Sequence, residues 1–141
     1  AIDVSKTALE VARKNSADLK TPISFYEIDI LKTQSIENLM FDIIVSNPPY
    51  IAKNEAHTMN DNVLEFEPHL ALFVENNDPL LFYKVIADFA QANLNQGGKL
   101  YFEINQRLGK EVIELLERKC FSNVLLHKDL SGNDRMVYAN K

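Results

Sequence analysis

The stretch Asn-Pro-Pro-Tyr at residues 47–50 carries the most specific chemical signal in this 141-residue chain. Two consecutive prolines, Pro48 and Pro49, remove two backbone N–H donors and fix two φ angles, so the turn is stiff. The groups left to bind a ligand are the side-chain oxygen of Asn47 and the carbonyl of Pro48, beside the ring of Tyr50. Two convergent acceptors and a flat ring suit a planar NH2 group. The alternative is a rigid turn without chemistry, because Asn-Pro often begins turns.

The elements expected around this turn alternate between strands and helices. The turn follows an apolar strand, Phe41 to Ser46, whose block Ile43-Ile44-Val45 indicates cover on both faces. Residues 51–78 show neither a helical nor a strand period, and so long a connection is usually functional or disordered. Before the turn we expect a buried strand Ala1–Val4, a helix from an N-cap at Ser5 to about Ala17, and a strand Ile23–Asp29. After it we expect a helix from Pro79 to Gly97-Gly98 that buries Phe82, Ile86, Phe89 and Ala90, a strand Lys99–Ile104, and a helix Leu108–Lys119 that buries Val112, Leu115 and Leu116. The chain is expected to end in two strands, Val124–Leu130 and Arg135–Ala139, joined by a turn at residues 131–134.

This alternation predicts an α/β fold, in which a mostly parallel sheet is covered by helices and ends in one antiparallel hairpin. Ligands of such sheets bind beyond the carboxyl ends of the strands. That rule places Asp3, Asp29, the turn at Asn47 and residues 103–105 at the functional edge.

Net charge and the number and spacing of Cys, Gly and His residues argue against several classes of function. A net charge of -5 argues against nonspecific binding to a phosphate backbone. The sequence contains no run of about 18 apolar residues, so no membrane-spanning segment is expected. The single cysteine, Cys120, fits a reducing cytoplasm and is expected to pack as a small residue. The first glycine is Gly97, so the first 96 residues hold no Gly-rich nucleotide loop. His57, His69 and His127 lack metal-ligand spacing, and no metal site is expected.

Residues 54–78 hold six acidic side chains and no Lys or Arg. Such a segment would repel a phosphate backbone and attract a basic protein surface. The alternative is a solvated acidic loop without a partner.

The Asn-Pro-Pro-Tyr turn after an apolar strand resembles the motif of methyltransferases that modify amino groups with S-adenosylmethionine. The flanking sequence is similar to HemK-type methyltransferases, the release-factor glutamine methyltransferases, over nearly the whole chain. The resemblance implies a Rossmann-like class I methyltransferase sheet. It also implies methyl transfer from S-adenosylmethionine to the side-chain amide nitrogen of a glutamine, in the Gly-Gly-Gln tripeptide of a peptide chain release factor. The matching segments are Asp3-Val4-Ser5, Ala8-Leu9, Ala12, Asn15, Asp42 to Ser46, Glu67-Pro68, Ala71-Leu72, Gly97-Gly98, Glu103-Ile104, Lys128-Asp129-Leu130 and Asp134-Arg135.

Three residues are expected to bind the cofactor besides Asn47. Asp3 ends its strand where Rossmann-like folds place a carboxylate on ribose hydroxyls; the alternative is a helix-start carboxylate favoured by the helix dipole. By resemblance, Asp29 or its neighbour Ile30 borders the adenine, and the alternative is an ordinary loop carboxylate.

The substrate residues implied by the resemblance are those of the turn. Asn47 and Pro48 would fix the glutamine amide, and Tyr50 would hold its plane, on the corner that Pro49 stiffens. Glu67 lies in a segment similar to the family's substrate-side loop, and no step is assigned to it.

The sequence departs from the family at its start and at residues 73–78. The family's Gly-rich loop follows a first strand, behind an N-terminal helical domain, and this sequence begins after them. We therefore expect residues 1–141 to be a partial catalytic domain without measurable cofactor affinity of its own. Where the family usually has a Gly-rich stretch, residues 73–78 read Phe-Val-Glu-Asn-Asn-Asp. Two other functions stay open: a nucleic-acid amino-methyltransferase that stacks adenine or cytosine on Tyr50, and an inactive fragment or binding module.

Overall fold

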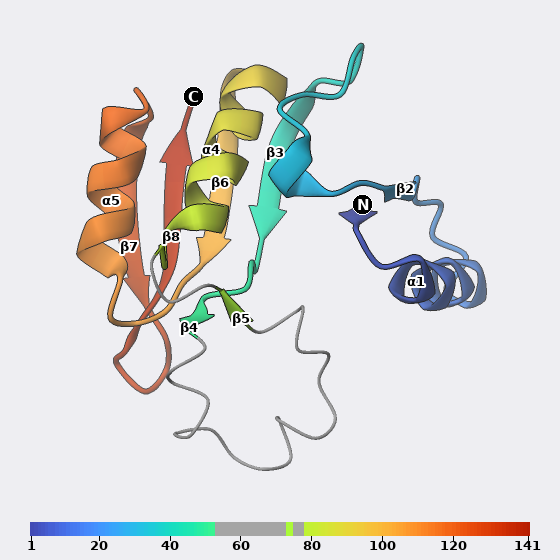
Figure 1. Ribbon diagram of the computed structural model, residues 1–141, viewed down its shortest axis with the longest axis horizontal. Coiled ribbons are helices and arrows are strands. Elements are labelled where there is room, and N and C mark those ends of the chain that lie inside the picture. The colour runs from blue at the N-terminus through green and yellow to red at the C-terminus, as the bar shows by residue number, and fades with distance from the viewer. Residues whose placement is uncertain (53–72, 75–77) are drawn as a thin grey trace. The chain divides into compact units, whose positions relative to one another are not determined.

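The computed structural model describes residues 1–52, 73–74 and 78–141, which form two compact units, Ala1–Gln34 and Ser35–Lys141 (Figure 1). No helix of the described residues is long and apolar enough to cross a bilayer. Each unit is an assembly of strands and helices in its own right.

The smaller unit contains strand β1 (Ile2–Asp3), helix α1 (Lys6–Asp18), strand β2 (Tyr26–Glu27) and the short 3-10 helix η1 (Ile30–Lys32). The Ser5 hydroxyl caps α1 by accepting the Ala8 N–H at 3.2 Å, as the sequence predicted. The strands pair in parallel but are shorter than expected. The expectation that residues 1–4 are buried is wrong, because β1 has only β2 as a partner within this unit and both strands are exposed.

The larger unit is built on a four-stranded sheet of order β3-β6-β8-β7. Strands β3 (Phe41–Ser46) and β6 (Leu94–Glu103) run parallel, and the terminal hairpin of β7 (Ser122–Lys128) and β8 (Asp134–Asn140) adds its second strand antiparallel to β6. The predicted α/β class with a C-terminal antiparallel hairpin is confirmed. Two-residue strands β4 (Ile51–Ala52) and β5 (Phe73–Val74) also pair in parallel, within a segment where the sequence predicted none.

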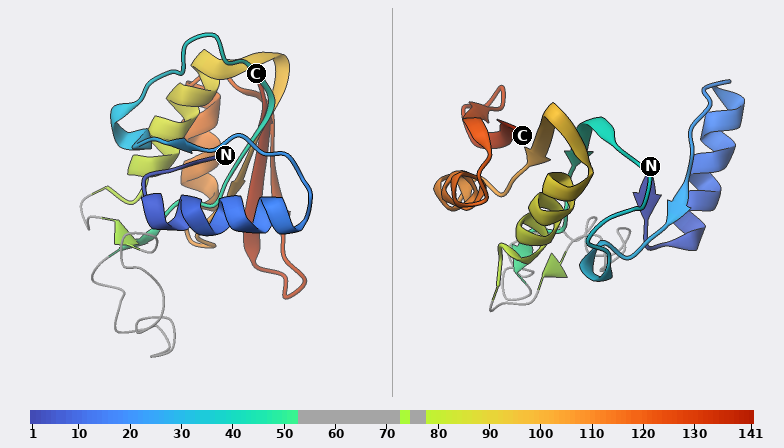
Figure 2. Two further views of the ribbon diagram at one scale, coloured as in Figure 1. Left: turned by 90° about the vertical axis from the view of Figure 1, so that its right-hand side faces the viewer. Right: turned by 90° about the horizontal axis from the view of Figure 1, so that it is seen from above.

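Helices α4 (Leu81–Asn93) and α5 (Gly109–Arg118) cover one face of this sheet (Figure 2). Val112, Leu115 and Leu116 of α5 are buried as predicted. In α4 the fully buried ring is Tyr83, whereas Phe82, which was expected inside, is half-buried. The helices and strands therefore share one core, whose strand side is formed by Leu100, Phe102, Ile104, Val137 and Ala139.

The end of α4 differs from the prediction. The helix was expected to run to Gly97-Gly98, but Leu94 is already extended (ψ 142°) and pairs with Phe41 of β3. The two glycines instead form an irregularity in β6: Gly97 has φ +77°, and a Cβ on Gly98 would lie 2.8 Å from the Asn95 carbonyl oxygen of its own strand and 3.2 Å from the Asp42 carbonyl oxygen of β3. Glycine is required here for a close approach of strands and not for a helix cap.

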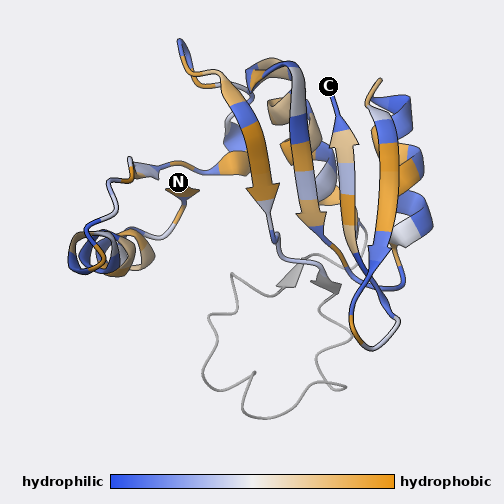
Figure 3. Ribbon diagram, turned by 180° about the vertical axis from the view of Figure 1, so that it is seen from behind, coloured by the Kyte–Doolittle hydropathy of each residue, from blue (hydrophilic) through white to orange (hydrophobic). Residues whose placement is uncertain are grey.

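The strands of this sheet are rich in apolar residues (Figure 3), and several of these residues are exposed. Val45 of β3, at the edge of the sheet, is 74% exposed, and Ile43 is 56% exposed. The expectation that β3 is covered on both faces is therefore wrong for the described residues, because both helices of this unit lie on one side. Val45 stands in register with Tyr101, Tyr138 and Leu125, and the two tyrosine rings stack at 5.3 Å.

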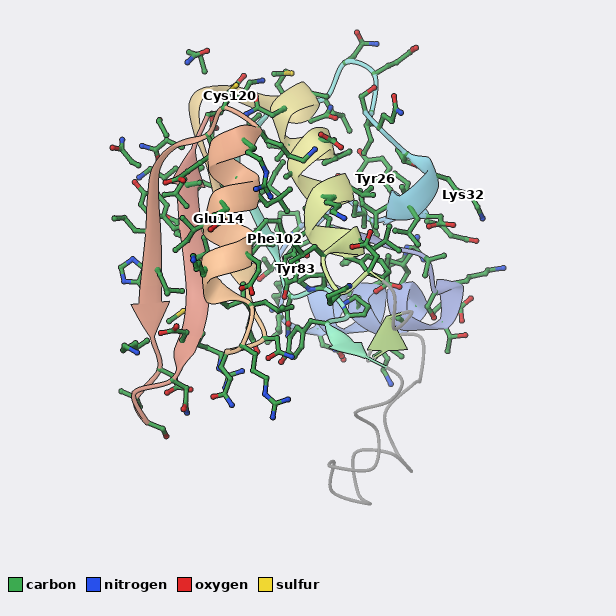
Figure 4. The ribbon with its side chains drawn as sticks, turned by 60° about the vertical axis from the view of Figure 1, so that its left-hand side comes forward. Tyr26, Lys32, Tyr83, Phe102, Glu114 and Cys120 are labelled. Carbon is green, nitrogen blue, oxygen red and sulfur yellow. The ribbon has the colours of Figure 1, made fainter. Side chains whose placement is uncertain are left out.

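Cys120 follows α5 in a left-handed conformation (φ 63°) and is exposed, which contradicts its expected burial (Figure 4). The turn it makes directs Phe121 into the core instead, where that ring is 5% exposed. The Phe121 N–H closes the helix end on the Leu116 carbonyl at 3.1 Å.

One buried amide joins the chain before β3 to α4. The Asn93 side chain donates to the carbonyls of Ile36 and Leu39 at 2.9 and 2.7 Å, and accepts the Ile36 N–H at 3.2 Å. Asn93 is 2% exposed, so these backbone groups have little water to replace the amide.

We therefore predict that Asn93→Ala lowers the free energy of unfolding by about 2–4 kcal/mol, because three hydrogen bonds are lost and their backbone partners stay buried. Urea unfolding followed by circular dichroism measures the change. Asn95→Ala is the matched control: it loses one exposed bond to Asp42, and about 1 kcal/mol or less is expected. Equal effects of the two substitutions would contradict this role of Asn93.

Candidate functional site

The Asn-Pro-Pro-Tyr turn lies at the carboxyl end of β3, beside the carboxyl end of β6. Ser46 pairs with Phe102, so Asn47, which follows β3, and Glu103, the last residue of β6, lie at the same edge of the sheet. The sequence predicted this juxtaposition of the turn with residues 103–105, and the parallel register confirms it.

The first two residues of the turn have opposite environments. Asn47 is exposed, and its side chain makes no hydrogen bond to any described residue. Pro48 is buried and Pro49 half-buried, so the rings of the turn pack down while the amide faces outward. No described residue donates a hydrogen bond to the Pro48 carbonyl either. Among the described residues, both acceptors that the sequence singled out are therefore without a hydrogen-bond donor.

The half-buried Tyr50 closes the turn against charged side chains of two other strands. Its hydroxyl is in polar contact with the Glu103 carboxylate of β6 and the Arg135 guanidinium of β8. Burial, and then the negative charge of Glu103, raise the pKa of Tyr50 above its usual value near 10, while Arg135 opposes the shift. The phenol is therefore neutral across the physiological range.

Tyr83 of α4, which interacts with Tyr50 and Glu103, is fully buried and lies beside Phe102 (Figure 4). Its ring meets Phe102 edge-on, with centroids 5.2 Å apart at 89°. Its hydroxyl donates to the Glu103 carbonyl at 3.5 Å, at the limit of hydrogen-bond length. Burial raises the pKa of Tyr83 strongly, so this hydroxyl too stays protonated.

Arg135 is held from its other side by the terminal hairpin. Its Nε lies 3.3 Å from Oδ2 of Asp129, and Oδ1 of Asp129 accepts the N–H groups of Ser131 and Asn133 at 2.9 Å each. These bonds, above all the one from Asn133, lower the pKa of Asp129. From the sequence, Glu103 was expected at the functional edge but was given no step, and neither Tyr83 nor Arg135 was expected to be a site residue. The available signal was topological, since an antiparallel neighbour of β6 begins where β6 ends.

The smaller unit brings Asp3 and Asp29 to the carboxyl ends of its two parallel strands. Oδ1 of Asp3 accepts the Ser5 N–H at 2.7 Å, and the exposed carboxylate keeps its second oxygen open to a hydroxyl donor. Asp29 caps η1 through the Leu31 N–H at 3.0 Å and pairs with Lys32 at 2.9 Å, which lowers its pKa. Both carboxylates are acceptors of the kind that sugar hydroxyls and an exocyclic amine require. Of the two carboxylates, that of Asp3 has the fewer partners among the described residues.

The remaining expectations fall on other parts of the chain. Ile30 is half-buried at the start of η1, next to Asp29. Glu67 and nearly all of the acidic stretch 54–78 lie outside the described residues. Within the described ranges there is no cluster of three or more His, Cys, Asp or Glu side chains that could hold a metal ion.

Comparison with known proteins agrees with this geometry. A family model described as "Methyltransferase small domain" matches residues 1–66. The fold is similar to the crystal structure of a methyltransferase from Pyrococcus furiosus, with a TM-score of 0.67 at 18% identity, covering 100% of this chain and 61% of that one. The α/β fold is therefore the partial Rossmann-like fold that such methyltransferase structures share.

Some curated proteins are more similar to this chain in sequence than that crystal structure is. The chain is 56% identical over 140 residues to a release factor glutamine methyltransferase of Flavobacterium psychrophilum, covering 99% of this chain and 49% of that protein. It is 45% identical over 139 residues to the protein of that name from Bacteroides thetaiotaomicron, covering 99% and 50%. Over nearly its whole length the chain is similar to release factor glutamine methyltransferases, and it spans about half the length of these relatives.

The contacts of Tyr50 predict its titration. Its pKa should lie above 10, and Glu103→Gln should bring it down, because the carboxylate no longer opposes the phenolate. The contribution of Tyr50 to the free energy of unfolding is fully present below pH 10, and it is lost as the pH rises through the pKa that Tyr50 has in the folded protein. NMR of tyrosine labelled at Cζ measures the pKa, with Tyr50→Phe to assign the signal.

Glu117→Gln, at the far end of α5, removes the same charge away from this edge and should leave the Tyr50 titration unchanged. A Tyr50 pKa below 10, or an equal response to both substitutions, would contradict the contact described here.

Proposed function

We propose that this chain is part of the catalytic domain of an enzyme that transfers a methyl group from S-adenosylmethionine to a glutamine side-chain amide in a peptide chain release factor. The observation that carries the proposal is the outward-facing Asn47 on a stiff turn at the carboxyl end of β3, with the Pro48 carbonyl beside it. Similarity to relatives that are named release factor glutamine methyltransferases supports the substrate class.

An amide nitrogen is a poor nucleophile because its lone pair is delocalised into the carbonyl. Acceptance of one N–H by Oδ1 of Asn47 and of the other by the Pro48 carbonyl fixes the amide and raises the electron density on nitrogen. The Tyr50 ring holds the amide plane from the side. These residues act by aligning the amide and by their preorganised dipoles. Both effects lower the barrier to methyl transfer, and neither needs a charged protein side chain at the amide.

The methyl donor, when bound, supplies a sulfonium whose methyl carbon is the electrophile. In the smaller unit, the exposed Asp3 carboxylate fits the ribose hydroxyls. Ile30 and Asp29 are the residues proposed at the adenine, and Asn47 borders donor and substrate. Asp29 would have to keep its cap on η1 while it accepts from the adenine amine.

The substrate surface proposed for the release factor includes Pro49 and Glu67 besides the turn's acceptors. The acidic sequence at 54–78 suits a basic protein surface better than a nucleic acid. Since proteins that terminate translation act in the cytoplasm, we place the enzyme there.

Asn47→Ala in the intact protein should lower kcat for release-factor methylation by about 100-fold or more, because one of the two amide acceptors is lost. Affinity for S-adenosylmethionine, measured by calorimetry, should change little. Transfer of a labelled methyl group to purified release factor gives the rate. An unchanged rate with retained cofactor binding would refute the role of Asn47.

Asn15→Ala is the control, because Asn15 is an exposed residue of α1 whose side chain makes no described contact. The same assay offers DNA and RNA as acceptors in parallel reactions. Label should enter the release factor, and label in nucleic acid alone would overturn the proposed substrate.

A further inference from the structure

The terminal hairpin reaches the edge of the sheet that carries the Asn-Pro-Pro-Tyr turn. Strand β8 begins there, antiparallel to β6, with Glu103 opposite Met136 and the Ile104 N–H on the Arg135 carbonyl at 2.9 Å. The backbone of Arg135 is thereby fixed to the strand end that neighbours Asn47.

The side chain of Arg135 is fixed as well. It lies between Asp129, with Nε and Oδ2 3.3 Å apart, and Tyr50. Its side chain is 31% exposed and that of Asp129 25%, so this pair is partly withdrawn from water. Asp129 itself is held by the N–H groups of Ser131 and Asn133 within the hairpin turn. A chain of contacts thus runs from the hairpin turn to the phenol.

The groups that face Tyr50 come from three elements: Glu103 from β6, Arg135 from β8 and the neutral Tyr83 from α4. One negative and one positive charge therefore meet at a single hydroxyl. Removal of the guanidinium would leave the Glu103 carboxylate without its positive counterpart beside Tyr50, and the phenol would lose one of its two polar anchors.

We propose that Arg135, oriented by Asp129, is a positioning residue for methyl transfer: it fixes the Tyr50 ring and so the plane of the substrate amide. This inference rests on the proposed function and adds to it a residue about 85 positions from the turn. Arg135 does not touch the reacting atoms. Its guanidinium bonds the Asp129 carboxylate through Nε and also interacts with the Tyr50 phenol, and the planar, delocalised group differs in this from the point charge of an ammonium.

The test uses the intact protein and compares Arg135→Gln and Arg135→Lys with Lys128→Gln. Lys128 is the matched control, because it too is a hairpin cation in an ion pair, with Asp134 at 2.9 Å, and it has no described contact with Tyr50. Arg135→Gln should lower kcat about 10- to 100-fold while KM for the methyl donor stays within about twofold. Arg135→Lys should recover only part of the rate, and Lys128→Gln should stay within about twofold of the parent.

Two further readouts separate positioning from a structural role. Loss of the positive charge in Arg135→Gln should raise the pKa of Tyr50, whereas Lys128→Gln should not move it. In a Tyr50→Phe background, Arg135→Gln should cause little further loss of kcat, because the two residues act as one unit. Additive losses, an unmoved Tyr50 pKa or equal effects at Arg135 and Lys128 would overturn the inference.

Thermal unfolding of every variant checks the fold, and Arg135→Lys carries the comparison if Arg135→Gln does not fold. If Arg135→Lys then matches the parent in kcat and in the Tyr50 pKa, the inference fails. If the parent itself does not methylate release factor, the proposed function fails; if it does and the Arg135 variants match Lys128→Gln, only the present inference fails.

Discussion

The site depends on the parallel pairing of β3 with β6. Because Ser46 stands beside Phe102, both strands release their chains at one edge, and the residues that follow become neighbours although more than 50 positions separate them. The irregularity at Gly97-Gly98 lies at the other end of the pair and leaves the register from Ile43 to Ser46 unbroken. The parallel pairing therefore brings Glu103 next to Tyr50, which no local sequence signal indicates.

The antiparallel strand β8 completes the same edge from the opposite direction. It enters the sheet where β6 leaves it, so its first residues carry Arg135 to the phenol. The result is a neutral aromatic ring set between one acidic and one basic group, and it also interacts with a buried tyrosine. The charged groups Glu103 and Arg135 interact with Tyr50, whereas Asn47 and Pro48 contribute uncharged acceptors to the turn. This division suits an amide, which carries no charge itself.

The sequence predicted those parts of the fold that depend on short-range pattern. The strand Phe41–Ser46, the buried face of α5 and the Ser5 cap follow from residues within a few positions of one another. It failed where partners are distant. Gly97-Gly98 was read as a helix stop because the pairing of Leu94 with Phe41 is not visible locally, and Ile43-Ile44-Val45 was read as covered on both faces because apolar content does not say which face has a helix. At the site, the turn was found by its own residues, whereas the roles of Glu103 and Arg135 depend on strand order.

The turn after α5 has a practical consequence. A left-handed residue there sends Phe121 inward and leaves the sulfur of Cys120 on the outside. This chain has no other thiol. A maleimide carrying a spin label or a fluorophore would therefore attach at one defined point, at the end of α5 remote from the edge that carries the Asn-Pro-Pro-Tyr turn, and would report on this unit without any engineered cysteine.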